Sequence, residues 1–126
     1  MRHGSRILML ALLVTAPACA PSRGGGAVSP ADVPVRVQVT NKFALPVEVY
    51  AVGAGIRYRL GIVHPGMVAT LTVPPAMVGG GQVEFHAGPN SGGGMYRSGG
   101  LLLSAGSIVD LVVEAQLFAS TAVIRP

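Results

Sequence analysis

The sequence predicts an all-β fold, an antiparallel β-sandwich of seven or eight short strands. Short runs of Val, Leu, Ala and Ile alternate with polar residues, which is the two-residue period of a half-buried strand. The 18 Gly and 10 Pro residues fall largely between these runs, where they indicate turns. No long segment combines helical periodicity with helix caps, and a small β-barrel is the alternative to a sandwich.

Alternating valines predict the first two strands, at residues 33–40 and 45–52. In both segments apolar side chains occupy every second position, and charged or polar residues lie between most of them. Successive side chains of a strand point to opposite faces of the sheet. One side of each strand is therefore expected to face the core and the other to face solvent.

The third strand, residues 56–63, is expected to bury its even-numbered side chains and to expose Arg57 and Arg59. A two-residue turn at residues 53–54 would join it to the second strand as a type II′ hairpin, because glycine occupies the first central position. The next turn, residues 64–66, is expected to hold its histidine in solvent.

The register set by that hairpin turn pairs Glu48 with Arg59 and Tyr50 with Arg57 on the outer face. Exposed pairs of this kind each contribute about 0.2 to 1 kcal/mol. The two arginines are therefore interpreted as part of an ordinary hairpin and not as a binding site.

The remaining apolar runs complete the sandwich. The odd-numbered residues of the segment 67–73, beginning with Met67, are expected in the core. Residues 101–104 are too apolar for a face to be assigned. Further strands are expected at residues 82–87, 107–115 and 118–125, the last at a sheet edge, with a single helical turn around residues 75–78. The resulting domain is of immunoglobulin-like size.

Residues 1–18 predict a signal peptide. Arg2 and Arg6 give a positively charged start, about ten apolar residues follow, and small residues come next. A transmembrane helix needs about 20 apolar residues. The segment is therefore expected to direct export without serving as a transmembrane anchor.

The segment TAPAC, residues 15–19, resembles the lipobox of bacterial lipoproteins, whose cysteine is lipidated and becomes the mature N-terminus. The resemblance implies cleavage before Cys19, although Ala16 stands where that family usually has leucine. The alternative is cleavage after Ala20 at an A-x-A pattern, which would place Pro21 first. Cys19 is the only cysteine, so both routes give an exported domain without a disulfide.

Three parts of the chain follow from these observations: a signal peptide at 1–18, a lipidated cysteine with a flexible linker at 19–32, and a β-sandwich domain at 33–126. The linker is rich in Gly, Pro, Ser and Ala, a composition typical of a tether. The resemblance to lipoproteins implies a membrane contact through a lipid anchor, and Ala20 after the cysteine favours the outer membrane. A periplasmic or secreted protein is the alternative.

Charge and motif content argue against nucleic-acid binding and catalysis. The formal net charge is +4, but the basic residues are scattered and form no stripe that alternates with aromatics. The domain holds Ser, Thr and two histidines, yet it has no nucleophile elbow and no paired carboxylates on convergent loops. The sequence predicts neither an enzyme nor a bound cofactor.

A metal carrier is the competing hypothesis. Imidazole and thioether ligands together select Cu(I), and the set is distantly similar to the ligands of envelope copper carriers with a β-sandwich. The spacing departs from theirs, and Met67 also fits the buried side of its strand. The candidate ligands are His64, Met67, Met77, His86 and Met95.

The segment GPNSGGGMYRSGG, residues 88–100, is expected to form a long hairpin loop. Its glycines lack the strand-to-helix context of a phosphate-binding loop. Met95, Tyr96 and Arg97 are expected to project from it as a candidate recognition loop, because tyrosine and arginine are enriched in binding hot spots.

Three short patterns, V-x-V-x-N at 37–41, V-x-V-Y at 47–50 and R-Y-R-L-G at 57–61, resemble those of small β-sandwich proteins of bacterial envelopes that carry a lipoprotein leader. The resemblance implies a sandwich and export, and it brings no known activity. The sequence therefore predicts a lipid-anchored module of the cell envelope with a non-catalytic binding or structural role and an envelope protein as partner.

Overall fold

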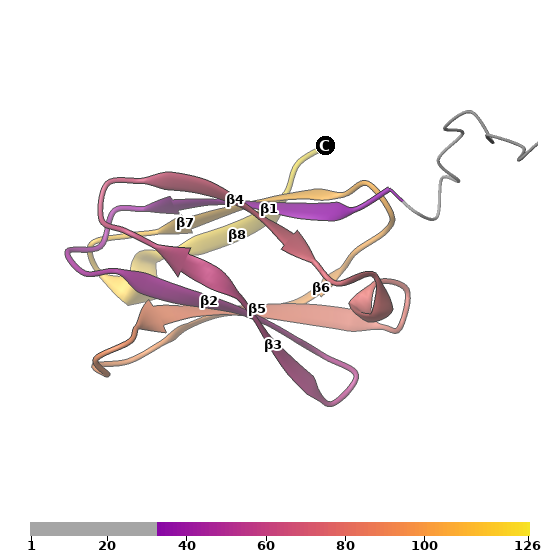
Figure 1. Cartoon of the computed structure of the whole chain (residues 1–126), viewed down its shortest axis with the longest axis horizontal. Helices are drawn as coiled ribbons and strands as arrows, with labels where there is room; N and C mark the ends of the chain where they lie inside the picture. The colour runs from indigo at the N-terminus through magenta and orange to yellow at the C-terminus, as the bar shows by residue number, and fades with distance from the viewer. Residues whose placement is uncertain (1–32) are drawn as a thin grey trace, which may run out of the picture.

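A computed structural model of the chain describes residues 33–126 and shows a β-sandwich (Figure 1). The predicted signal peptide, Cys19 and the linker lie outside the described residues. The elements in chain order are β1 (Val35–Asn41), β2 (Val47–Gly53), β3 (Ile56–Val63), β4 (Val68–Val73), the 3-10 turn η2 (Pro75–Met77), β5 (Gln82–Pro89), β6 (Tyr96–Leu102), β7 (Ile108–Val113), the 3-10 turn η3 (Leu117–Ala119) and β8 (Thr121–Ile124).

The eight strands form two packed sheets, in the orders β4-β1-β7-β8 and β3-β2-β5-β6. The predicted all-β sandwich and its number of strands are thus confirmed. One pairing differs from the purely antiparallel arrangement that was expected: β1 and β7 run parallel, while the other neighbours are antiparallel. A long crossover through the second sheet separates these two strands in the chain, which permits the parallel pairing.

The core lies between the two sheets and consists mainly of valine. Alternate residues of β1, β2, β5 and β7 are buried, as the two-residue period predicts, and Phe85 and Leu111 are the largest fully buried side chains. The helical turn expected near residue 75 is present as η2, which places Met77 in the core with 5% of its surface exposed. Within residues 33–126, no helix is long and apolar enough to cross a bilayer.

The β2–β3 hairpin turn differs by one residue from the prediction. Gly53 pairs with Ile56, so the turn residues are Ala54 and Gly55, both with positive φ (50° and 73°). Two central residues with positive φ define a type I′ turn, whereas a type II′ turn was expected at residues 53–54. The right-handed twist of the hairpin favours either primed turn, and the glycine pattern fits both.

A β-bulge in β3 explains why its burial pattern was predicted incorrectly. Val49 pairs with Gly61 and Tyr50 with Arg59, so Leu60 is the additional residue. The bulge reverses the side to which later residues point: Val63 is buried and Ile62 is exposed. Ile56 and Tyr58 do lie on the core-facing side, but they are 54% and 49% exposed because the hairpin extends beyond the sandwich (Figure 1).

Two further segments correct the sequence-based assignments. Met67 was expected in the core, but it is 57% exposed because it precedes β4, which begins at Val68. Residues 88–100 were expected to form one long loop. Instead β5 continues to Pro89 and β6 begins at Tyr96, so that only a short connection at 90–95 remains.

The buried side chain of Asn41 joins three segments at one end of the sandwich. Its Nδ2 donates hydrogen bonds to the carbonyl oxygens of Leu45 and Val63, both at 2.9 Å, and its Oδ1 accepts one from the backbone N–H of Phe43 at 2.8 Å. The Asn41 backbone also bonds to the β3–β4 turn through Gly66 and Met67. Asn41 therefore fixes the β1–β2 connection against the end of β3.

Candidate functional site

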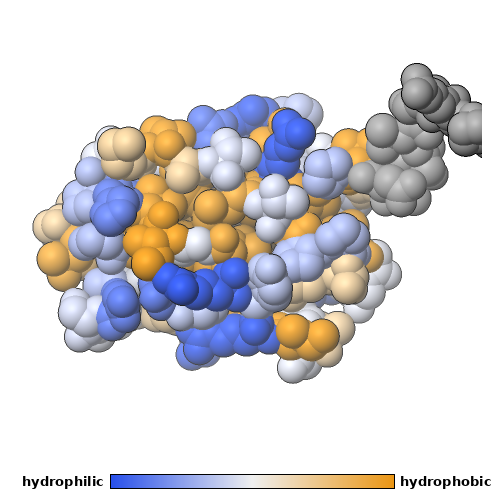
Figure 2. Space-filling view, viewed as in Figure 1, coloured by the Kyte–Doolittle hydropathy of each residue, from blue (hydrophilic) through white to orange (hydrophobic). Residues whose placement is uncertain are grey.

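The outer face of the β3-β2-β5-β6 sheet brings together polar residues from all four strands. One row across the sheet contains Arg59, Tyr50, His86 and Arg97 in register. Arg57 and Met95 reach the same face beside this row. We call this surface the arginine face. In Figure 2, hydrophilic residues lie along its lower part, where β2 and β3 run.

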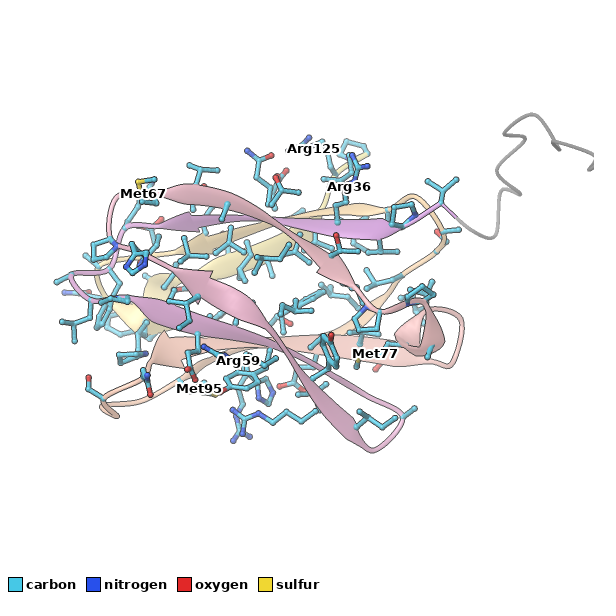
Figure 3. All side chains as sticks on the ribbon, viewed as in Figure 1. Arg36, Arg59, Met67, Met77, Met95 and Arg125 are labelled. Carbon is cyan, nitrogen blue, oxygen red and sulfur yellow. The ribbon has the colours of Figure 1, made fainter. Side chains whose placement is uncertain are left out.

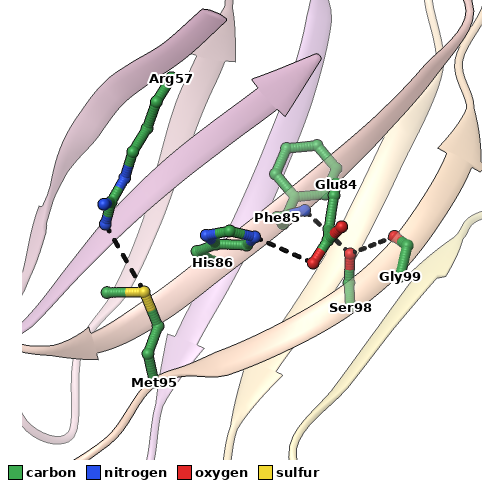
Figure 4. A network of polar contacts seen from close by, with 7 residues as sticks. All are labelled: Arg57, Glu84, Phe85, His86, Met95, Ser98 and Gly99. Carbon is green, nitrogen blue, oxygen red and sulfur yellow. Dashed lines mark hydrogen bonds and ion pairs between the residues drawn. The ribbon is translucent and has the colours of Figure 1, made fainter. Parts of the chain in front are cut away.

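The Arg57 side chain crosses the sheet and is held in place at two points. Its guanidinium carbon lies 4.0 Å from the centre of the Tyr50 ring on β2. Its Nη2 lies 3.6 Å from the Sδ of Met95, which precedes β6 (Figure 4). A guanidinium stacked on an aromatic ring keeps free N–H groups at its edge. Arg57 is thus preorganised, and it joins the β2–β3 hairpin to the segment 88–100, which holds the candidate recognition residues.

Glu48 contacts two residues of the arginine face, Arg59 and Tyr50. Its carboxylate pairs with the Arg59 guanidinium at 3.2 Å and accepts a hydrogen bond from the Tyr50 hydroxyl. The hydrogen bond to Glu48 raises the pKa of Tyr50 above its ordinary value, and desolvation acts in the same direction. The contacts expected from the sequence, Glu48 with Arg59 and Tyr50 with Arg57, are therefore present. They form diagonally, because the register differs from the predicted one.

His86 and Glu84 form the second side-chain pair of the face. His86 Nε2 lies 2.9 Å from Glu84 Oε1, and only 12% of the histidine side chain is exposed (Figure 4). A bulge in the β5–β6 pairing falls between these two residues, and the backbone N–H of Phe85 bonds to the Ser98 hydroxyl instead. Ser98 in turn donates to the carbonyl of Gly99 at 2.7 Å. The Ser98 hydroxyl therefore has a structural role, because both of its hydrogen bonds are to backbone groups.

The acidic side chains of residues 33–126 are all engaged by basic ones. Glu48 pairs with Arg59, Glu84 with His86, Asp110 with Arg125 and Glu114 with Lys42. The remaining arginines of the domain have no carboxylate of residues 33–126 within 4.0 Å; they are Arg36, Arg57 and Arg97. Two of the three lie on the arginine face.

The third such arginine is on the opposite side of the molecule. Arg36 pairs with Thr72 on the outer face of the other sheet, near Arg125 (Figure 3). There Arg125 makes two hydrogen bonds to Asp110 and one to Gln38. Hydrogen bonding to Arg125 lowers the pKa of Asp110, which indicates a structural ion pair.

Gly88 allows Met95 to lie close to the sheet. A Cβ atom at Gly88 would stand 2.7 Å from the Gly94 carbonyl oxygen and 3.2 Å from the Cα of Met95. The missing side chain therefore lets the 90–95 connection fold back over β5, where Met95 meets Arg57. This glycine, which the sequence marks only as part of a turn, helps to position the site.

The candidate recognition residues Met95, Tyr96 and Arg97 do not project together from a loop. Tyr96 lies opposite the buried Ala87 and packs against the core. Burial raises its pKa, while a backbone hydrogen bond from Ala122 acts in the opposite direction. Because neighbouring residues of a strand face opposite sides, only Met95 and Arg97 reach the arginine face.

The five candidate copper ligands are not brought together. Met67 and His64 lie at the β3–β4 turn, Met77 is buried in the core, and only His86 and Met95 share the arginine face. Figure 3 shows the three methionines at separate places. Among residues 33–126, no group of three His, Cys, Asp or Glu side chains is placed to hold a metal ion.

Two depressions adjoin this surface, and neither was expected from the sequence. One, of about 620 Å³, is lined by Leu45, Pro46, Ile62, His64, Asn90 and Ser91. The other, of about 450 Å³, lies beside Met95 and Arg97 and includes Phe118, which is 84% exposed. Phenylalanine and arginine are both enriched in protein interfaces. Phe118 was assigned to an edge strand, but it lies in η3 just before β8.

Neither the models of known protein families nor the curated proteins with which the chain was compared give a match.

Proposed function

We propose that the protein is an exported, lipid-anchored module of the bacterial cell envelope that binds an anionic partner without catalysis, through the arginine face. Its anchor would be Cys19, and the outer membrane is the proposed location. The support for export and anchoring is the leader of residues 1–18 and the lipobox-like segment that ends at Cys19. The proposed partner is another protein of the envelope.

The observation that carries the binding proposal is the pair of uncompensated arginines on one sheet face. Arg57 and Arg97 have no carboxylate within 4.0 Å among the described residues, whereas the basic residues Arg59 and His86 beside them do. Arginine is enriched in hot spots, and a preorganised guanidinium loses little entropy on binding. Arg57 stacks on Tyr50, so it meets this condition.

Purification of the intact lipidated protein from its native envelope, together with co-purifying proteins, tests the binding role. The double variant Arg57→Ala, Arg97→Ala is expected to lose the partner. Arg36→Ala is the matched control, because it removes an equally unpaired arginine from the other sheet. Equal recovery of the partner by the double variant and by the wild type would contradict the proposal.

Mass spectrometry of the mature N-terminus tests the anchor separately. A diacylglycerol-modified Cys19 at the first position is expected. An unmodified terminus at Pro21 or later would exclude the lipid anchor and leave a secreted or periplasmic binding module.

A further inference from the structure

The free edge of β3 is the least protected backbone of the arginine-bearing sheet. Within residues 33–126, β3 is one of the two end strands of this sheet and pairs with β2 alone. Its first residues, 56–59, extend with β2 beyond the body of the sandwich at the lower right of Figure 1. An edge strand presents unpaired N–H and C=O groups, which can pair with a further strand.

The turn geometry determines which backbone groups face outward. A two-residue hairpin loop is flanked by a hydrogen-bonded pair, here Gly53 and Ile56, and hydrogen-bonded pairs alternate with non-bonded ones. Ile56 and Tyr58 therefore direct their backbone groups toward β2. Arg57 and Arg59 direct their N–H and C=O groups toward the free edge.

The side chains at this edge differ sharply between the two faces. On the core-facing side, Ile56 and Tyr58 are 54% and 49% exposed, although they are large and apolar. On the outer side stand Arg57 and Arg59, and the carboxylate near them, that of Glu48, is paired with Arg59. A strand added here would have its side chains alternately against apolar and against cationic surface.

The other edges of the two sheets are less suitable. β6 contains Gly99, with φ of 75°, and a bulge that interrupts its pairing with β5. β8 has only four residues. β4 is regular, but it contacts β3 of the other sheet, as Leu71 does at Gly61, where a Cβ atom would meet it at 3.0 Å. The start of β3 is therefore the edge at which an extended segment can pair with exposed backbone N–H and C=O groups.

We propose that β3 accepts an added strand from a protein partner in which acidic and apolar residues alternate. This inference rests on the proposed binding function and specifies the partner. Acidic side chains opposite Arg57 and Arg59 would lie on the arginine face, where the Arg57 guanidinium would turn from Tyr50 and Met95 toward the added carboxylate. The apolar residue between the two acidic ones would cover Tyr58. A second copy fits poorly, because antiparallel self-pairing centred on Tyr58 places Arg57 against Arg59 twice, and like charges directly opposite are destabilising.

The test uses the mature protein and a synthetic probe peptide, Glu-Val-Glu-Val-Glu. Backbone hydrogen exchange is followed by NMR at saturating peptide. The amides of Arg57 and Arg59 are expected to exchange rapidly in the free protein and slowly in the complex. The amides of Ile56 and Tyr58 should be protected in both states.

Two matched peptides separate charge from strand pairing. Replacing each Glu by Gln is expected to weaken binding about two- to thirty-fold, from two lost cross-strand charge pairs. N-methylation of the amides that pair with the β3 edge keeps every side chain and should abolish binding. On the protein, Tyr58→Ser is expected to weaken binding, while Val123→Ser, at the comparably exposed edge strand β8, should not.

The outcomes distinguish this inference from the proposed function. Strand addition is overturned if the peptide does not bind, if the Arg57 and Arg59 amides stay unprotected, or if the N-methylated peptide binds equally well. If the N-methylated peptide binds and Arg97→Ala weakens its binding, the arginine face is retained as the site and strand addition is excluded. If the double variant Arg57→Ala, Arg97→Ala recovers as much partner from the native envelope as the wild type does, the proposed function would instead be excluded.

Discussion

Replacing Asn41 by alanine is expected to destabilise the domain strongly, because its side chain is buried and hydrogen-bonded. Three side-chain hydrogen bonds, with Leu45, Val63 and Phe43, are lost. Each contributes about 1 kcal/mol net, and a buried group left without a partner costs more. The loss in the free energy of unfolding is therefore about 2 to 4 kcal/mol, a large part of the roughly 5 to 15 kcal/mol of a typical domain.

Urea unfolding followed by circular dichroism measures this effect. The midpoint should fall while the m-value stays constant, because the change affects stability and not the surface exposed on unfolding. Thr40→Ala on the same strand is the control, with an expected change of at most about 0.5 kcal/mol. A loss in the free energy of unfolding below about 1 kcal/mol for Asn41→Ala would refute the conclusion that Asn41 fixes the β1–β2 connection against the end of β3.

Three further predictions concern the turns and the site. Ala54→Asn should stabilise the protein by about 0.5 to 1 kcal/mol in thermal unfolding, because asparagine tolerates the left-handed turn position where alanine is strained; an unchanged or lower melting temperature would contradict this. Gly88→Ala should cost about 1 to 3 kcal/mol because its Cβ meets the Gly94 carbonyl, whereas Gly80→Ala meets no atom within 4 Å and should be neutral; equal effects would argue against the close approach. Ultraviolet titration should show Tyr50 ionising above the ordinary tyrosine pKa, and Glu48→Gln should lower that pKa. Since the fold favours the neutral phenol, its contribution to stability is complete below the unfolded pKa of about 10 and is lost as the pH rises through the folded pKa.

The sequence period predicted the sandwich and most of its core correctly. Val35, Val37 and Val39 are buried, as are Val83 and Phe85, because simple alternation holds wherever a strand is regular. The prediction was wrong for Ile62, since a bulge at Leu60 reverses the alternation and no residue type marks its position. For Met67 the assumed strand began one residue too early.

The candidate site was only partly predictable. Local pairing rules anticipated the contacts of Arg57 and Arg59 within the β2–β3 hairpin. They could not anticipate that Met95 and His86 share this face, because β5 is next to β2 in the sheet but is separated from it in the sequence by β3 and β4. One signal was present in the sequence: in a strand that begins at Tyr96, alternation separates Tyr96 from Arg97.

Photo-crosslinking in the intact envelope from the two sheet faces tests the proposed recognition surface most directly. Benzoylphenylalanine is introduced in place of Val52, which pairs with Arg57 on the arginine face, or in place of Thr72, which pairs with Arg36 on the opposite face. A covalent adduct with a partner is expected from position 52 only, and Arg57→Ala should abolish it. An adduct that forms equally from position 72, or none from position 52, would contradict the arginine face as the recognition surface.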